Sequence, residues 1–186
     1  MLLTTKLIKA LFNFELMTRI GLISDTHSHF DERLVKYFKE CDEIWHAGDV
    51  GNIDVIKQLT KIKPVRGVYG NIDGQDIRKL FPKHLKFTCE EVKVWITHIG
   101  GYPNRYSIDV RDRIKTNPPN LFISGHSHIL KVMFDKKLNL LHINPGAAGK
   151  SGFHKVKTIV RFTIDKKDIK DLEVIELGPK TENVSL

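Results

Sequence analysis

Short apolar runs alternate with helical patterns in the first half of the chain and follow one another in the second half. The apolar runs predict strands at residues 19–24, 43–47, 65–69, 86–89, 92–97, 121–124, 131–134, 138–143, 158–165 and 171–177. Helical spacing predicts helices at 31–40, 53–62 and 107–116, with Asp31 as the N-cap of the first. This is too much β-structure for one sheet between two layers of helices. We therefore expect an α/β fold of two packed sheets with helices outside.

A residue type that can bind a metal follows five of these predicted strands. The strands lead into Asp25-Thr26-His27, Asp49, Asn71, His98 and His126-Ser127-His128. Loops converge beyond the carboxyl ends of strands in α/β folds, and binding sites gather there. Gly48, Gly70 and Gly125 adjoin these residues, and glycine permits an unusual backbone turn that aims a neighbouring side chain into a cavity. Core packing does not predict this repetition, so we expect a metal site.

The donor set has two Asp, one Asn and four His, and it contains no thiolate. A cysteine-based structural zinc site is therefore disfavoured. Oxygen and imidazole donors suit Mn, Fe, Zn, Co or Ni, and the residues alone do not choose among these metals. Seven donors are too many for one ion of ordinary coordination, so two ions that share a carboxylate fit better. Paired ions about 3.5–4 Å apart are the usual device for in-line attack at phosphorus.

The order Asp-x-His, Gly-Asp, Gly-Asn-x-Asp, His, Gly-His-x-His resembles the calcineurin-like metallophosphoesterase superfamily. The short chain and the Asn144-Pro145-Gly146 turn are similar to its small prokaryotic phosphodiesterase group. The resemblance covers residues 19–177 and implies a four-layer α/β/β/α sandwich of two packed mixed sheets with flanking helices. It also implies two divalent metal ions, with Mn as the first expectation and Fe, Zn, Co or Ni as alternatives.

The same resemblance implies a role for each donor. One ion would be held by Asp25, His27 and His128, and the other by Asn71, His98 and His126. Asp49 would bridge the ions and hold the water or hydroxide that attacks phosphorus. Asn71 and His98 are also the expected phosphate contacts. Asn144 and Gly146 either present polar groups to the phosphate or hold the metal loops from behind.

One position departs from the superfamily pattern. Many members carry His directly after the Asn, where it stabilises the transition state or protonates the leaving group. This chain has Ile72 there, which can do neither. The small phosphodiesterase group also tends to lack that His, so hydrolysis stays the expectation, with a preference for good leaving groups. Asp73 either orients a metal ligand from behind or is a simple turn carboxylate, and His46 is either such an orienting group or a core residue.

The chain carries 30 Lys and Arg against 22 Asp and Glu, a net charge of +8. This excess suits phosphate-bearing partners without choosing among them. A small phosphoester is the expected partner. No motif supports nucleic acid, so a nuclease is only a variant of the enzyme hypothesis. The alternative from another class is a protein-binding scaffold of the same fold with little or no catalysis, as in a retromer subunit. The filled ligand positions argue against it, and the oligomeric state stays open.

The ends of the chain complete the picture. We expect an N-terminal extension at 1–16, one domain over 17–178 and a tail at 179–186, with translation starting at Met17. Lys6 and Lys9 interrupt the first apolar stretch, which disfavours a secretory signal. No apolar run reaches the roughly 18 residues of a membrane span, so no membrane partner is expected. Two cysteines, Cys41 and Cys89, make no disulfide scaffold and favour a reducing, cytoplasmic location.

Overall fold

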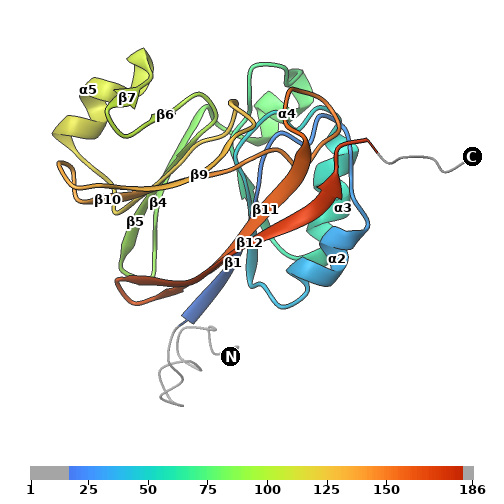
Figure 1. Ribbon diagram of the computed structural model, residues 1–186, viewed down its shortest axis with the longest axis horizontal. Coiled ribbons are helices and arrows are strands. Elements are labelled where there is room, and N and C mark those ends of the chain that lie inside the picture. Colours follow the sequence, from blue (N-terminus) through green and yellow to red (C-terminus); the bar gives the residue numbers. More distant parts are fainter. Residues whose placement is uncertain (1–16, 182–186) are drawn as a thin grey trace, which may run out of the picture.

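A computed structural model describes residues 17–181 of the chain (Figure 1). The predicted extension at 1–16 and most of the predicted tail lie outside the described residues. The first sheet has five strands in the order β12 (Asp168–Pro179), β11 (Val156–Asp165), β1 (Met17–Ile23), β2 (Glu43–His46) and β3 (Val65–Gly67). β1, β2 and β3 are parallel, and β11 and β12 run antiparallel to their neighbours. The sheet is therefore mixed, and β1, β2 and β3 form its parallel part.

The second sheet also has five strands, in the order β4 (His84–Cys89), β5 (Val92–Thr97), β8 (Leu121–Ile123), β10 (Leu140–Pro145) and β9 (Leu130–Asp135). β5, β8 and β10 are parallel, with β4 and β9 antiparallel at the two edges. A small two-stranded sheet of β6 (Gly101–Tyr102) and β7 (Arg105–Tyr106) lies beside it. The helices are α2 (Arg33–Phe38), α3 (Ile53–Ile62), α4 (Gln75–Leu80) and α5 (Ile108–Thr116).

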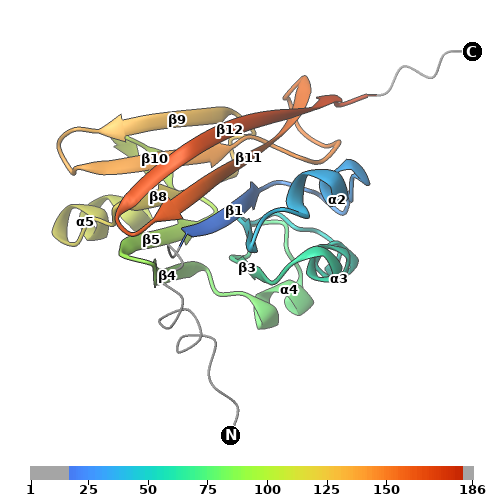
Figure 2. The ribbon, with the colours of Figure 1, turned by 90° about the horizontal axis from the view of Figure 1, so that it is seen from below.

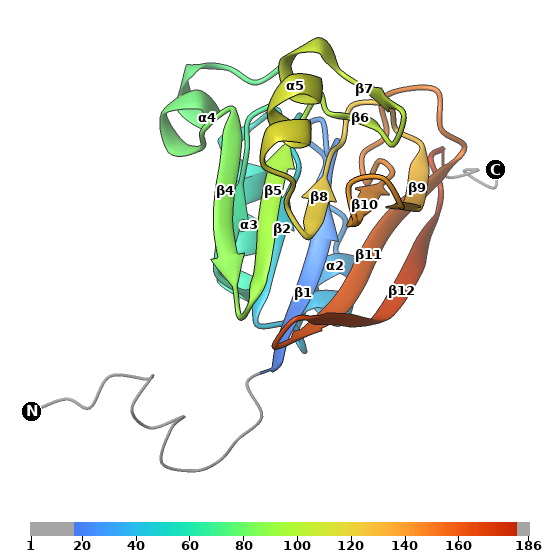
Figure 3. The ribbon, with the colours of Figure 1, turned by 90° about the vertical axis from the view of Figure 1, so that its left-hand side faces the viewer.

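Three separate apolar cores show that the described residues form four layers. One core joins α2, α3 and α4 to the first sheet and includes Leu34, Leu59 and Ile77. A second core lies between the two sheets, and a third joins the second sheet to α5. Alternation along the strands produces this division, since Leu22 faces the other sheet while Ile23 faces the helices. The predicted α/β/β/α sandwich is confirmed, and Figures 2 and 3 show α5 and the pair α2 and α3 on opposite sides of the sheets.

The predicted N-cap of the first helix is wrong. The cap residue is Glu32, and α2 begins at Arg33 rather than at residue 31. The Asp31 carboxylate still accepts the Arg33 N–H at 3.1 Å, and it also forms a buried ion pair with Lys157 of β11, whose Nζ atom is 2.9 Å away and fully buried. Burial would raise the pKa of Asp31, but hydrogen bonds from Arg33 and Lys157 outweigh it and hold that pKa well below its ordinary value.

Three short elements were not expected from the sequence: α4, β6 and β7. In α4 only Ile77 is buried, so its sequence shows no helical stripe of apolar residues. β6 and β7 have two residues each, too few to show any period. Within residues 17–181, no helix combines the length and the apolar composition that crossing a membrane requires.

Candidate metal centre

The carboxyl ends of five strands meet at one edge of the sandwich. β1, β2 and β3 reach this edge from the first sheet, and β5 and β8 reach it from the second. Loop backbones then bond to one another: the Asp25 N–H donates to the Gly48 carbonyl at 3.0 Å, and the Gly125 N–H donates to the His98 carbonyl at 3.0 Å. The His126 N–H crosses between the sheets to the Asp25 carboxylate at 3.1 Å. The loops from both sheets therefore form one surface.

A first cluster of possible metal ligands consists of Asp25, His27 and His128. The Nε2 atoms of His27 and His128 are 3.2 Å apart, and His128 Nε2 is 3.1 Å from Asp25 Oδ1. The other oxygen of Asp25 accepts hydrogen bonds from the Ser24 hydroxyl at 2.6 Å and from the His126 N–H. Asp25 is therefore oriented by one oxygen, and its second oxygen is free to face the two imidazoles.

A second cluster consists of Asp49, His98 and His126. His98 Nε2 lies 3.2 Å from Asp49 Oδ1, and the His98 and His126 ring centroids are 5.2 Å apart. The His98 Nδ1–H donates to the Ala47 carbonyl at 2.8 Å, which turns Nε2 toward the cluster. The backbone N–H of Ile72 donates to Asp49 Oδ1 at 3.1 Å.

The carboxylate of Asp49 lies between the two clusters. Its Oδ1 atom faces His98, while its Oδ2 atom is 3.9 Å from His27 Nε2 in the first cluster. Asn71, the seventh predicted donor, is exposed on the loop after β3 and lines a cavity of about 270 Å³ together with His98. The structure thus brings all seven predicted donors to one edge of the fold, six of them within two compact groups.

The contacts inside these clusters favour a bound cation between the donors. The neutral His98 ring uses its Nδ1 proton for Ala47, so the lone pair on Nε2 faces a carboxylate oxygen. The Nε2 atoms of His27 and His128 also face each other at 3.2 Å, and in the Nδ1–H tautomer both lone pairs can point at one ion. Asp25 Oδ1 and His98 Nε2 are buried with no hydrogen-bond partner among residues 17–181, an arrangement that costs free energy unless a positive charge lies between the donors. The residues therefore fit two divalent ions.

The pKa of His98 reflects the negative charge of the carboxylates around it. Burial alone would lower the pKa of His98, but the Asp49 and Asp25 carboxylates and the Ala47 carbonyl together outweigh burial and raise it. Burial would likewise raise the pKa of Asp49, but the nearby His98 imidazole and the Ile72 N–H outweigh burial and lower it. A metal ion and a proton therefore compete for the same position, so metal affinity falls as the pH is lowered.

Backbone strain is concentrated at the donors. Five of the seven have positive φ angles: Asp25 (54°), His27 (47°), Asp49 (53°), His126 (68°) and His128 (57°). Residues other than glycine rarely adopt this left-handed region, and such strain collects at functional sites. Tight turns after the strands therefore aim these side chains at the clusters.

The glycines beside the donors act in two different ways. Gly48 has a φ of +93° and provides the turn expected from the sequence. Gly70 and Gly125 have no such angle, and the expectation of an unusual turn there is wrong. A Cβ atom on Gly70 would collide with the Asp49 carboxylate, and one on Gly125 would collide with the Ser24 hydroxyl. These two positions need glycine because the backbone passes so close to Asp49 and Ser24.

Asp73 joins two donor-bearing loops. Its buried carboxylate accepts the N–H of Gly51 at 2.7 Å and the N–H of Gly70 at 2.7 Å, so it holds the loops after β2 and β3 together. Nothing in the motif spacing indicated Arg78, which strengthens the same region by donating to the backbone carbonyls of Asp73, Gly70 and Asn71.

The polar groups of Asn144 and Gly146 are engaged within the protein. The Asn144 amide donates to the Gly125 carbonyl at 2.8 Å and to the Ser127 hydroxyl at 3.1 Å, and its oxygen accepts the Gly146 N–H at 3.0 Å. Of the two predicted roles, these contacts favour support of the metal loop from behind over contact with phosphate.

His46 belongs to a buried hydrogen-bond network behind the centre. Its Nδ1 atom accepts the Gly48 N–H at 3.1 Å, and its Nε2–H donates to the Thr26 hydroxyl at 3.0 Å. The Thr26 hydroxyl donates in turn to the Val50 carbonyl at 3.0 Å. Burial lowers the pKa of His46 to about 4, so the ring stays neutral and holds the loops after β1 and β2 together.

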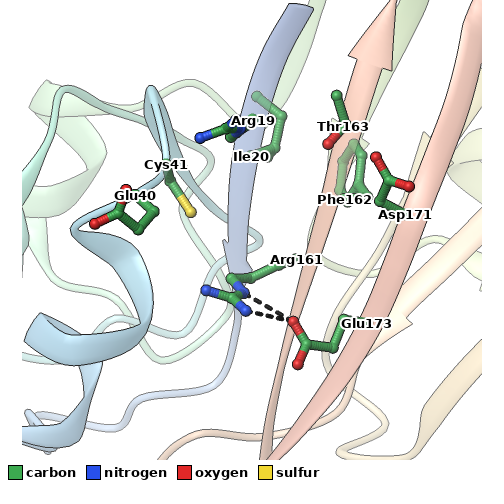
Figure 4. A pocket seen from close by; sticks show the side chains of 9 residues that line it. All are labelled: Arg19, Ile20, Glu40, Cys41, Arg161, Phe162, Thr163, Asp171 and Glu173. Atoms are coloured by element: carbon green, nitrogen blue, oxygen red, sulfur yellow. Dashed lines mark hydrogen bonds and ion pairs between the residues drawn. The ribbon is translucent and has the colours of Figure 1, made fainter.

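Another cavity, of about 350 Å³, lies nearer the amino-terminal end of β1 (Figure 4). There Arg161 donates to the Glu173 carboxylate, with its Nε atom 3.1 Å away. Burial raises the pKa of Cys41 to about 11, so its thiol stays protonated at neutral pH. This cavity offers neither an activated nucleophile nor a cluster of metal donors.

Comparison with known proteins agrees with this arrangement. A model of the calcineurin-like phosphoesterase superfamily domain matches residues 18–167, and the chain belongs to that superfamily. A probable metallophosphoesterase of Methanothermobacter thermautotrophicus is 31% identical over 134 residues, which cover 69% of this chain and 76% of the relative. A second one, from Methanocaldococcus jannaschii, is 27% identical over 159 residues, which cover 80% of this chain and 77% of the relative. The resemblance drawn from the motifs is confirmed.

Two solved structures illustrate the fold. An archaeal phosphodiesterase superposes with a TM-score of 0.65 at 22% identity, covering 84% of this chain and 99% of its own. Vps29 of Entamoeba histolytica in complex with Zn²⁺ superposes with a TM-score of 0.68 at 12% identity, covering 88% and 99%. At these identities the likeness is one of fold.

Proposed function

We propose that this protein hydrolyses phosphodiesters with the help of two divalent metal ions, of which Mn is the first expectation. The observation that carries the proposal is the position of Asp49. Its two oxygens face different clusters, Oδ1 at 3.2 Å from His98 Nε2 and Oδ2 at 3.9 Å from His27 Nε2. A carboxylate with this orientation suits a bridge between paired ions.

The donors divide between the ions by cluster. Asp25, His27 and His128 would hold one ion, and Asn71, His98 and His126 would hold the other, with Asp49 shared. Ions bound there supply an activated water and stabilise negative charge on the phosphoryl oxygens. The chain keeps the donors aimed without reorganisation: Ala47 orients His98, and the Ile72 N–H orients Asp49.

The preference for a diester with a good leaving group rests on Ile72. This side chain is 48% exposed beside Asn71 and has no proton to give to a departing alcohol. Asp73, the nearest carboxylate in sequence, already accepts two backbone N–H groups. An aryl oxide leaves without protonation, whereas an alkyl oxide does not, so aryl diesters are the expected substrates.

The test compares turnover of bis(p-nitrophenyl) phosphate with that of ethyl phosphate, after elemental analysis identifies the bound metal. Faster hydrolysis of the alkyl monoester would overturn the diester preference. Asp49→Ala removes the shared carboxylate and is expected to abolish paired-metal binding and to lower kcat by about 10³-fold. Asp54→Ala is the matched control, because Asp54 is 61% exposed and pairs with Lys57. Full activity in Asp49→Ala would refute the assignment.

The same experiments address a protein-binding scaffold. That alternative predicts that the protein, loaded with the metal identified by elemental analysis, hydrolyses no phosphoester. The presence of donors at all seven positions supports catalysis instead. We also propose a cytoplasmic location, supported by the free thiols of Cys41 and Cys89. Oxidation state of these thiols in freshly lysed cells is the test, and a disulfide-linked form would contradict it.

A further inference from the structure

A second cavity adjoins the candidate metal centre on its other side. It has a volume of about 350 Å³, and its lining includes Ile99, Tyr102, Arg105, His126, Ile129 and Lys131. His126 also belongs to the second cluster of metal donors, so whatever fills this cavity lies next to the reacting phosphorus. The β6–β7 hairpin covers one side of the cavity, and β9 contributes Lys131 from the other.

Part of the lining is apolar and exposed. Ile99 is 44% exposed and Ile129 is 61% exposed, and each directly follows a candidate metal donor. The Tyr102 ring adds an aromatic surface. Exposed apolar side chains at the mouth of a polar site suit the body of an organic group rather than a bare inorganic phosphate.

The same cavity carries two cations that have no carboxylate partner. Within residues 17–181, neither Arg105 nor Lys131 forms an ion pair, and no Asp or Glu lines the cavity. The Lys131 Nζ atom lies 3.6 Å from the centroid of the Tyr102 ring, a cation–π contact that fixes its position at the cavity wall. Two positive charges in a partly enclosed, carboxylate-free site favour an anionic ligand.

The smaller cavity next to Asn71 differs in this respect. It also has two cations, but Arg78 is bonded to backbone carbonyls and Lys83 pairs with Asp109. Ile99 lines both cavities, so it lies between them at the edge of the metal centre. A diester whose phosphorus sits at the centre can place one ester arm on each side of Ile99.

We propose that the cavity beside His126 binds a substrate arm with a planar apolar body and an additional phosphate, held by Ile99, Tyr102 and Ile129 and by Arg105 and Lys131. The proposal rests on the phosphodiesterase function and deepens it. It assigns the leaving group to the cavity next to Asn71 and the retained, phosphorylated arm to this one. The substrate class is therefore a phosphodiester that carries a second phosphate on its retained arm.

The kinetic test uses two substrates with one leaving group. They are the p-nitrophenyl ester of thymidine 5′-phosphate and the same ester with a further phosphate on the 3′ oxygen. The wild-type protein is expected to show a kcat/KM about tenfold higher for the phosphorylated substrate. Lys131→Ala is expected to remove most of that preference, and Lys131→Arg to retain it. Lys136→Ala is the matched control, because Lys136 is exposed outside the cavity.

A binding test decides the proposal independently of turnover. Calorimetry on chelator-treated protein compares thymidine 3′,5′-bisphosphate with thymidine 5′-phosphate. Tighter binding of the bisphosphate, weakened in Lys131→Ala and in Arg105→Ala but not in Lys136→Ala, supports the cavity assignment. Equal binding of the two nucleotides overturns it. Hydrolysis of both substrates at equal rates overturns this inference and leaves the phosphodiesterase function standing, whereas absence of hydrolysis in the metal-loaded protein refutes that function.

Discussion

Asp73 is the sharpest place to test how the metal loops are held. Its carboxylate is 3% exposed and accepts two short backbone hydrogen bonds, one from Gly51 and one from Gly70. Asp73→Asn keeps the size of the side chain but leaves one oxygen to accept. The amide NH₂ then faces a backbone N–H, so one buried donor loses its partner and the remaining bond loses its charge.

The magnitude follows from those two contacts. A hydrogen bond to a charged group contributes about 1.5–3 kcal/mol, and a buried donor without a partner costs about 1–3 kcal/mol. We expect Asp73→Asn to lower the free energy of unfolding of the metal-free protein by about 3 kcal/mol. For a chain of this length that corresponds to a fall in Tm of about 6–12 °C.

The assay is urea unfolding in the presence of a chelator, so that metal binding does not contribute. Asp76→Asn is the control: Asp76 is exposed in the first turn of α4, and its loss is expected to cost about 0.5 kcal/mol. If Asp73→Asn were no more destabilising than the control, Asp73 would be an ordinary turn carboxylate. The reasoning about the two loops would then be wrong.

Two other perturbations probe the structure. Gly70→Ala places a Cβ atom against the Asp49 carboxylate and is expected to weaken Mn²⁺ binding at least about tenfold in calorimetry. Gly74→Ala, whose Cβ would meet nothing within 4 Å, should bind normally, and equal affinities in both variants would contradict the close approach. The folded state lowers the pKa of Asp31, so the ionised carboxylate stabilises the fold at pH values above the ordinary Asp pKa of about 4. That stability is lost as the pH falls toward the lower folded-state pKa. Asp31→Asn should therefore cost about 3 kcal/mol at pH 7 and flatten the loss of stability between about pH 5 and pH 2, whereas an unchanged acid profile would count against the ion pair with Lys157.

Much of the fold could be predicted because each strand depends mainly on the residues within it. β5, for example, was expected at its observed limits, since Val92 to Thr97 is rich in apolar and β-branched residues, is interrupted by a charge only at Lys93, and lies between Glu91 and His98. The limits of α2 could not be found in the same way. Asp31 accepts the Arg33 N–H as an N-cap would, yet the helix begins only at Arg33, and the carboxylate also pairs with a buried lysine 126 positions away in the chain. A contact over such a sequence separation cannot be read from local preference.

In the candidate site too, some features could be predicted from the sequence and others could not. Because a donor residue followed five of the ten predicted strands, the order of donors was readable, and so was the resemblance to the superfamily. The roles of Asn144 and Asp73 were not, since each depends on which loops lie beside it after folding. Arg78, Arg105 and Lys131 belong to no motif, and only the cavities and contacts around them drew attention to them.

The amino-acid sequence by itself determined which donors exist, that each follows a strand, and that thiolates are absent from the set. Tertiary structure decided that Asp49 lies between the two clusters, that Gly70 passes against its carboxylate, and that Arg105 and Lys131 share a cavity with His126. The physical reason is the distance along the chain between the residues whose contacts decide each feature. A strand and the turn after it depend on neighbouring residues, whereas the approach of loops from two sheets depends on the apolar core packed between those sheets.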